Sequence, residues 1–549
     1  MDVLREQGEV ERTKVIEEKT MSLNPESSKG AADAAAILRT APAAEGFNSN
    51  DGTKAIFRQS LTKRDKLLPI GALVLGALFV WLFYERYPGI SVPIFVTAFY
   101  AILFTYVRPS PVSKNWFGWF LSIPVFLLSL TFLLFRNDVF MILNLLMLLV
   151  LVLLQTLLIT GLNSFKWDSP GILIDLLFGM FYRCLAHVLK PFEITGLLLK
   201  KKTSENRKKT VGARVLTGLL ISAPLLAILL ALLSSADMVF GELIDWLPEL
   251  FEDLNIGEVV GRVITAFVIF IISFSYLWSL GHGDRPADSA LRGIAAEAPL
   301  QRERWDIVTV ITITASINII YLIFVVIQFA YLFGGSGLPE GFTYAEYARR
   351  GFFELILVTL LNIGFLACTL TFTGRGSAAA GAAFKALNTI MICCTFVMLI
   401  SAFYRMALYE RAYGYTFLRI VTQAFMIFLL ALFVATLARV WFERLPLLRS
   451  YIIIAIIAFT AVNFINVDGL IARKNIERYY STNKIDVLYF RTLSNAVVGD
   501  LMRLEEDGEP FIALAAREQL NQRRARLSSD WHWQSFNLTD FTARQVLMK

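Results

Sequence analysis

Eleven stretches of about 18 to 30 residues, each free of Asp, Glu, Lys and Arg, follow one another between Leu67 and Val467. The hydrocarbon layer of a bilayer requires a helix of about 20 apolar residues, and a soluble fold has no need to repeat such a segment eleven times. The pattern therefore predicts an all-α fold, a polytopic transmembrane helical bundle of about 11 spans. The predicted spans cover residues 67–84, 89–107, 116–135, 139–162, 215–235, 263–281, 307–333, 355–373, 386–404, 420–438 and 450–467.

The composition agrees with a chain that lies mostly in lipid. Of its 549 residues, 56% are hydrophobic and only 18% are charged, whereas soluble domains carry about 25% charged residues. The net charge of +7 is modest for this length, and most basic residues lie between the spans. No nucleic-acid partner is therefore expected.

The sequence predicts no cofactor, no metal site and no catalytic centre. The three histidines lie far apart, without the spacing of metal ligands. All four cysteines fall in or beside apolar segments, and the adjacent Cys393 and Cys394 suit packing better than redox chemistry. A phosphate-binding loop of the Gly-x4-Gly-Lys-Ser/Thr kind does not occur.

Two polar regions flank the predicted bundle, which covers residues 61–467. Residues 1–60 hold too few large apolar side chains to bury a core, which predicts a disordered polar N-terminal tail. Residues 468–549 instead show helical periodicity with charged faces, which predicts a small helical domain outside the membrane.

The segment 171–190 is ambiguous. It is apolar apart from one polar sector of the helix, which suits a helix lying in the membrane interface. Spanning would carry a carboxylate and a guanidinium into hydrocarbon, and it would also reverse the topology of everything that follows. We predict the interfacial position. The polar sector comprises Asp175, Arg183, His187 and Lys190.

The charges between the spans predict the orientation. With the N-terminus in the cytoplasm, the inner loops hold roughly 26 Lys and Arg and the short outer loops roughly 8, which follows the positive-inside rule. The segment Asp237–Glu258 carries seven acids and no base and is expected to face outward. An odd number of spans then places the C-terminal domain on the extracytoplasmic side of the cell membrane.

Ionisable residues gather at the expected outer ends of the spans. Two interpretations stay open: ion pairs and tyrosines that fix the depth of each helix, or a shared polar site beneath the C-terminal domain. A local ion-pair ladder is also expected, since Glu346, Arg350 and Glu354 follow one another at i, i+4 spacing. The candidate outer-rim polar site comprises Asp237, Tyr347, Arg349, Arg350, Glu354, Arg405, Glu410 and Asp468.

Several spaced motifs resemble one family of bacterial membrane proteins. They are Gln328–Gly335, Tyr344–Glu354, Tyr404–Tyr409, Tyr413–Thr416 with Arg419, Asn466–Asp468, Ile471–Ala472, Asn475–Ile476, Arg478–Tyr479 and Lys484–Asp486. On these motifs the chain resembles the family catalogued as domain of unknown function DUF4173, which is related to DUF4153. Two positions depart from the family pattern: Val467 stands where Pro is expected, and Asn495 where an acid is more typical. The resemblance implies a multispan fold and a bacterial host, and it brings no established activity or catalytic residues.

Three functions fit these features. The first is a non-enzymatic envelope sensor or assembly partner, in which the outer rim and the C-terminal domain recognise an envelope protein. The alternatives are a transporter of a neutral or amphipathic solute and a membrane enzyme acting on lipid-linked substrates through Asp237, Glu354 and Asp468. The expected partners are the lipid bilayer and an envelope protein.

Overall fold

The computed structural model describes residues 62–107, 109–112, 115–194, 256–283, 304–329, 352–374, 376–528 and 532–549, with six single positions between 222 and 237. All of these residues except Thr62 belong to one compact unit, Lys63–Lys549. The predicted N-terminal tail and the predicted span 215–235 lie outside the described residues, apart from single positions in that span. The described part is helical, and its one β-contact is an isolated bridge between Trp305 and Thr373. The all-α fold is confirmed.

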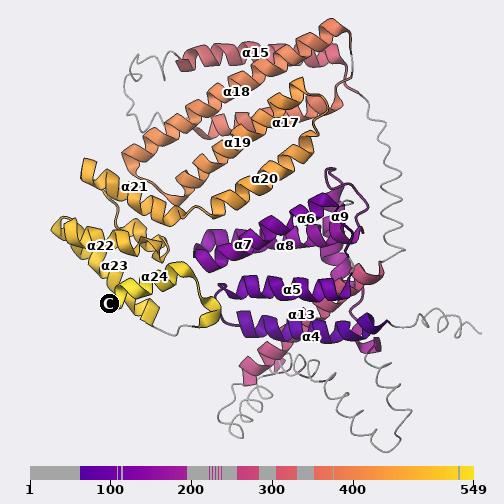
Figure 1. The fold of residues 1–549 in the computed structure, drawn as a ribbon. Helices are drawn as coiled ribbons and strands as arrows, with labels where there is room; N and C mark the ends of the chain where they lie inside the picture. The colour runs from indigo at the N-terminus through magenta and orange to yellow at the C-terminus, as the bar shows by residue number, and fades with distance from the viewer. Residues whose placement is uncertain are drawn as a thin grey trace, which may run out of the picture. The chain divides into compact units, whose positions relative to one another are not determined.

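The first group of apolar helices packs side by side (Figure 1). Helix α4 contacts α5 and α13, α5 contacts α7, and α7 contacts α8. Gly76 lets α4 approach α13 closely, because a Cβ there would lie 2.4 Å from the backbone oxygen of Ala266. The members are α4 (Lys63–Phe83), α5 (Ser91–Tyr106), α6 (Trp116–Phe120), α7 (Ser122–Leu134), α8 (Asp138–Thr160) and α13 (Ile256–His282).

A second group of apolar helices follows in the chain. Helix α18 contacts α15, α17 and α19, and α20 packs on both α19 and α7, so that α20 joins the two groups. Polar side chains cap the helices where the sequence leaves the apolar segments: Asp306 accepts from the backbone N–H of Thr309 at the start of α15. The members are α15 (Ile307–Gln328), α17 (Phe352–Phe372), α18 (Ala378–Tyr413), α19 (Phe417–Trp441) and α20 (Leu447–Asn463).

Eight helices of the described part are long and apolar enough to cross a membrane, and the number rises to nine if α20 and α21 form one span bent by 61°. Helix α5 is apolar but has only 16 residues. Each predicted span within the described residues therefore contains an apolar helix. The difference between nine and eleven comes from the short α5 and from the span 215–235, and the count of eight also leaves out α20.

The ambiguous segment 171–190 begins with the short helix α9 (Ile172–Phe178) and continues into a π-helical turn, η2 (Gly179–Arg183). Asp175 is 2% exposed and accepts hydrogen bonds from the backbone N–H groups of Ser164 and Phe165, at 2.9 and 2.8 Å. Arg183 is 1% exposed. These two side chains lie against protein, not on a polar edge open to headgroups. The interfacial position of the segment stays a prediction.

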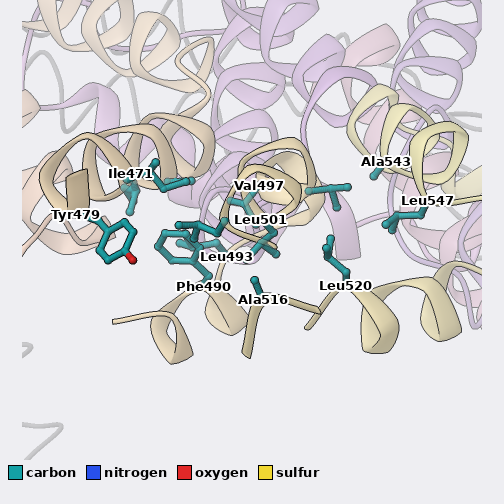
Figure 2. Close-up of a cluster of buried hydrophobic side chains, with 14 of the residues drawn as sticks. Ile471, Tyr479, Phe490, Leu493, Val497, Leu501, Ala516, Leu520, Ala543 and Leu547 are labelled. Carbon is teal, nitrogen blue, oxygen red and sulfur yellow. The ribbon is translucent and has the colours of Figure 1, made fainter. Parts of the chain in front are cut away.

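The C-terminal helices share a hydrophobic core of their own. Figure 2 shows its side chains converging from α21, the short turns, α22, α23 and α24. Phe490, Val497 and Leu501 are fully buried in it. The elements are α21 (Val467–Thr482), η5 (Leu488–Thr492), η6 (Asn495–Val497), α22 (Val498–Asp507), α23 (Pro510–Ser528), η7 (Trp533–Ser535) and α24 (Leu538–Leu547).

Candidate functional site

The C-terminal segment 532–549 docks on the α4–α5 loop and on the end of α7 in the first helix group. The backbone N–H of Ile90, in the α4–α5 loop, donates to the carbonyl oxygen of Phe536 at 2.9 Å. The Thr539 hydroxyl donates to the carbonyl oxygen of Leu134, at the end of α7, at 3.0 Å. Gly89 is required at this contact, because a Cβ there would lie 2.6 Å from the Phe536 oxygen.

Helix α21 docks on the second helix group. The Asn475 side chain both accepts from and donates to the backbone of Tyr415, in the α18–α19 loop, at 2.8 Å each. Arg478 donates to the carbonyl oxygens of Arg411 and Ala412, at 2.8 and 2.6 Å. The C-terminal helices therefore contact loops at one end of both helix groups.

Asp468 bridges the C-terminal helices and the bundle. It lies in the first turn of α21 and is 4% exposed. Its carboxylate accepts from the side-chain amide of Asn137, at 3.0 and 3.2 Å, and from the backbone N–H of Ser494 at 3.0 Å. Asn137 in turn caps α8 by accepting from the N–H of Phe140. One buried carboxylate thus joins α21, the start of α8 and the turn before η6.

A second bridge runs through a continuous chain of polar contacts. The Arg523 guanidinium donates to Asn495 Oδ1 at 2.8 Å, and the Asn495 amide donates to Asp540 at 2.7 Å. Asp540 pairs with Arg136 at 2.8 Å, and the Arg136 guanidinium lies 4.7 Å from the centre of the Tyr87 ring. The chain crosses from α23 through α24 to the α7–α8 and α4–α5 loops.

These two bridges border a cavity of about 660 Å³. It lies between the C-terminal helices and the loops of the bundle, and its volume falls within the range of pockets that hold small molecules, about 300 to 1,000 Å³. Its charged lining is rich in arginine. The charged residues are Arg86, Arg136, Arg491, Arg523, Arg526 and Arg544, with Glu85, Asp138, Asp468 and Asp540.

The deepest of these arginines remains a cation. Burial lowers the pKa of Arg523 to about 10, and the Arg526 cation acts in the same direction, while Asp468 and Asp540 oppose the shift. A pKa near 10 leaves the guanidinium charged at neutral pH. Its donors reach three acceptors: Asn495 Oδ1 and the carbonyl oxygens of Phe490 and Leu493.

The predicted outer-rim residues fall in different places. Asp468 lines the cavity. Arg405 is buried and donates to Gln328 of α15 at 3.3 Å, whereas Glu410 is buried and accepts from Gln423 of α19 at 2.7 Å. Glu354 and Asp237 are exposed. Outside the described residues lie Tyr347, Arg349 and Arg350, with Glu346 of the expected ion-pair ladder.

The length of α18 explains where Arg405 and Glu410 lie. The predicted span ends at residue 404, but α18 continues to Tyr413, because the intervening residues are good helix formers and include no Pro or Gly. Both side chains therefore project from a helix against α15 and α19, not from a loop.

Sequence reasoning missed most of the cavity's polar residues. Arg136, Asn137 and Asp138 form a polar triplet between two apolar spans, on the side predicted to be poor in basic residues. That triplet was a usable signal. Asn495 was noticed only as a departure from the pattern of the family that the chain resembles. Arg523 and Asp540 carried no signal, since residues of these types are ordinary on the surface of a helical domain.

Another polar cluster joins α4, α5 and α13 at the ends of these helices that lie away from the cavity. The Tyr106 hydroxyl lies 3.4 Å from Asp65 Oδ1 and 3.1 Å from His282 Nδ1, and His282 Nε2 lies 3.6 Å from the same Asp65 oxygen. Trp278 stacks on the His282 ring at 3.8 Å. The described residues hold no group of three or more His, Cys, Asp or Glu that could bind a metal ion.

Comparison with known proteins adds one relationship. The family described as a domain of unknown function (DUF4153) matches residues 122–504. No curated protein and no solved structure matches the chain. The matched region includes Asn137, Asp468 and Ser494, whereas Arg523 and Asp540 lie beyond it.

Proposed function

The chain belongs to the DUF4153 family of unknown-function domains, and from this premise we propose that it is a membrane recognition protein, a sensor or assembly partner that binds a ligand beneath its C-terminal helices. Its several long apolar helices make it a multi-pass membrane protein. The narrower placement in DUF4173, with the bacterial host that it implies, is part of the proposal.

One observation carries this proposal. The 660 Å³ cavity has walls from both the C-terminal helices and the loops of the bundle, so a ligand in it would contact both at once. Ligand binding shifts a conformational equilibrium only when the ligand contacts the two states differently. A ligand that contacts both the C-terminal helices and the loops of the bundle meets that condition. Any change in how these two parts pack against each other changes the contacts of the ligand. This arrangement suits a sensor, or a protein that presents an altered surface to an envelope partner.

The orientation is part of the proposal. Loops 84–90, 135–137 and 414–416 contact the C-terminal helices, so all of them lie at one end of the bundle. We place this end on the extracytoplasmic side, because the predicted inner loops hold roughly 26 Lys and Arg against roughly 8 in the predicted outer loops.

Single-cysteine labelling tests the orientation. In a variant without the four native cysteines, Glu506→Cys on α22 should react with a membrane-impermeant maleimide in sealed right-side-out vesicles. Arg444→Cys, in the α19–α20 loop, should react only after the vesicles are opened. Both positions are exposed. The reverse pattern would reject the orientation.

Filling the cavity tests the recognition function. Thr492 is exposed and lines the cavity, so Thr492→Trp should occupy part of it without removing a core contact. The variant should fail to restore the phenotype of cells that lack the gene, while Glu506→Trp, exposed on α22 outside the cavity, should restore it. Both proteins must reach the membrane at the normal level and resist trypsin normally. Full rescue by Thr492→Trp would reject the proposal.

A further inference from the structure

The chemical class of the ligand can be inferred from the arginines of the cavity. Arg491 lies on η5, is exposed and lines the cavity. In the described part of the chain, no hydrogen bond or ion pair engages its guanidinium group. An Arg side chain usually pairs with a carboxylate or a carbonyl oxygen where one is near, so an unengaged guanidinium in a cavity is available to a ligand.

The backbone that carries Arg491 is held in place by a second arginine. Arg523 donates to the carbonyl oxygen of Phe490 at 2.7 Å and to that of Leu493 at 2.9 Å, and these two carbonyls flank Arg491 on either side. A buried cation thus fixes the turn on which the exposed cation stands. Such fixing lowers the entropy lost when a ligand binds.

The deeper carboxylates of the cavity already accept hydrogen bonds from other protein groups. Asp540 accepts from Arg136, Asn495 and Asn537, and Asp468 accepts from Asn137 and the Ser494 N–H. The other two, Glu85 and Asp138, are exposed, and solvent and salt screen exposed charges.

Six arginines therefore face four carboxylates in one cavity, and the balance of charge there is positive. An excess of positive charge in a cleft raises the local concentration of anions. This balance favours an anionic ligand.

We propose that the cavity binds a phosphate group, either the headgroup of a lipid or a soluble phosphate ester, and that Arg491 supplies its accessible guanidinium fork. A guanidinium offers paired N–H donors that match two oxygens of a phosphate. A phosphate binds one fork through two of its oxygens and carries up to two negative charges, whereas a carboxylate carries one. The cavity volume leaves room for the rest of the ligand. This inference rests on the proposed recognition function and names its ligand class.

The test uses the full chain in lipid nanodiscs and follows the midpoint of thermal unfolding. One arm adds inorganic phosphate or glycerol phosphate to discs of neutral phosphatidylcholine. The other compares these discs with discs containing phosphatidylglycerol. Stabilisation in the first arm identifies a soluble phosphate, and stabilisation only in the second identifies a lipid headgroup.

Two matched variants locate the effect. Arg491→Gln should weaken the binding of phosphate about tenfold or more, the effect expected for losing a hydrogen-bonded charge. Arg503→Gln removes the same charge from the exposed face of α22, outside the cavity, and should bind as the unmodified chain does. An equal loss of phosphate affinity in both variants would show that binding depends only on the net charge of the protein, and it would overturn the inference.

Two further results would also overturn it: stabilisation in neither arm, or equal stabilisation by acetate. These failures are distinct from failure of the proposed function. If phosphate does not bind while Thr492→Trp still abolishes rescue, the cavity recognises another class of ligand. If Thr492→Trp restores the phenotype fully, the recognition function itself fails, whatever binds in the nanodiscs.

Discussion

The side-chain amide of Asn137 donates to both carboxylate oxygens of Asp468, at 3.0 and 3.2 Å, across a separation of 331 residues. Asn137 caps the start of α8 in the bundle, and Asp468 begins α21 of the C-terminal helices. The same carboxylate also accepts from the Ser494 N–H. Asp468 lines the cavity. It lies close in sequence to α20, the last described helix of the bundle, because only three residues separate α20 from α21.

Replacing Asp468 should loosen the C-terminal helices. Asp468→Ala leaves the Asn137 amide and the Ser494 N–H without their acceptor, and we expect a loss of about 2 to 4 kcal/mol. Asp468→Asn should lose less, about 1 to 2 kcal/mol, because its amide oxygen can still accept one of the two donors. Thermal unfolding in detergent and trypsin cleavage at the arginines of α23 measure the effect.

The control for Asp468 is Glu506→Gln, an exposed change on α22 that should shift stability by less than about 0.5 kcal/mol. Normal trypsin resistance of Asp468→Ala would contradict the bridging role that we assign to this carboxylate.

Removal of Asp540 should cost more than removal of its ion-pair partner. Arg136 is 38% exposed, so Arg136→Ala should lose only about 1 kcal/mol. Asp540 is 13% exposed and accepts from three side chains, so Asp540→Ala should lose about 2 to 3 kcal/mol. The double variant should lose less than the sum, because the two residues share one interaction. The prediction fails if Arg136→Ala is the more destabilising change.

Gly89→Ala should separate the C-terminal segment from the α4–α5 loop. The new Cβ would lie 2.6 Å from both the Phe536 oxygen and the Ser535 carbonyl carbon, so one backbone must move. We expect a lower unfolding temperature and faster trypsin cleavage near residue 526. Gly364→Ala, in α17, meets no atom within 4 Å and should be neutral or stabilising by up to about 1 kcal/mol. Equal behaviour of the two variants would show that the close approach at Gly89 is unimportant.

Asp175→Ala should free the loop that precedes α9. The carboxylate accepts from the backbone N–H groups of Ser164 and Phe165, and its loss leaves both unpaired, at a cost of about 2 kcal/mol. Hydrogen exchange at these two amides should become faster, whereas the exposed change Lys166→Ala should leave it unaltered. Unchanged exchange in Asp175→Ala would mean that the carboxylate does not hold this loop.

The sequence predicted the helices well and the polar contacts poorly. Apolar stretches such as 139–162 are recognisable because hydropathy is a property of consecutive residues, and α8 covers Asp138–Thr160. The end of α18 was less predictable, because the change from apolar to charged residues after residue 404 does not end a helix. Of the predicted outer-rim residues, Asp468 lines the cavity, while Arg405 and Glu410 bond to residues of α15 and α19.

The sequence by itself determined that this is an all-α chain built for a membrane, because the cost of burying charge in hydrocarbon is set by each segment alone. Only the tertiary structure decided which polar residues meet. Arg136 and Asp540 stand 404 residues apart and pair at 2.8 Å, and no local spacing encodes that contact. It depends on how α7 and α24 pack, and packing is settled by all the contacting helices together. The arginine-lined cavity is a product of that packing.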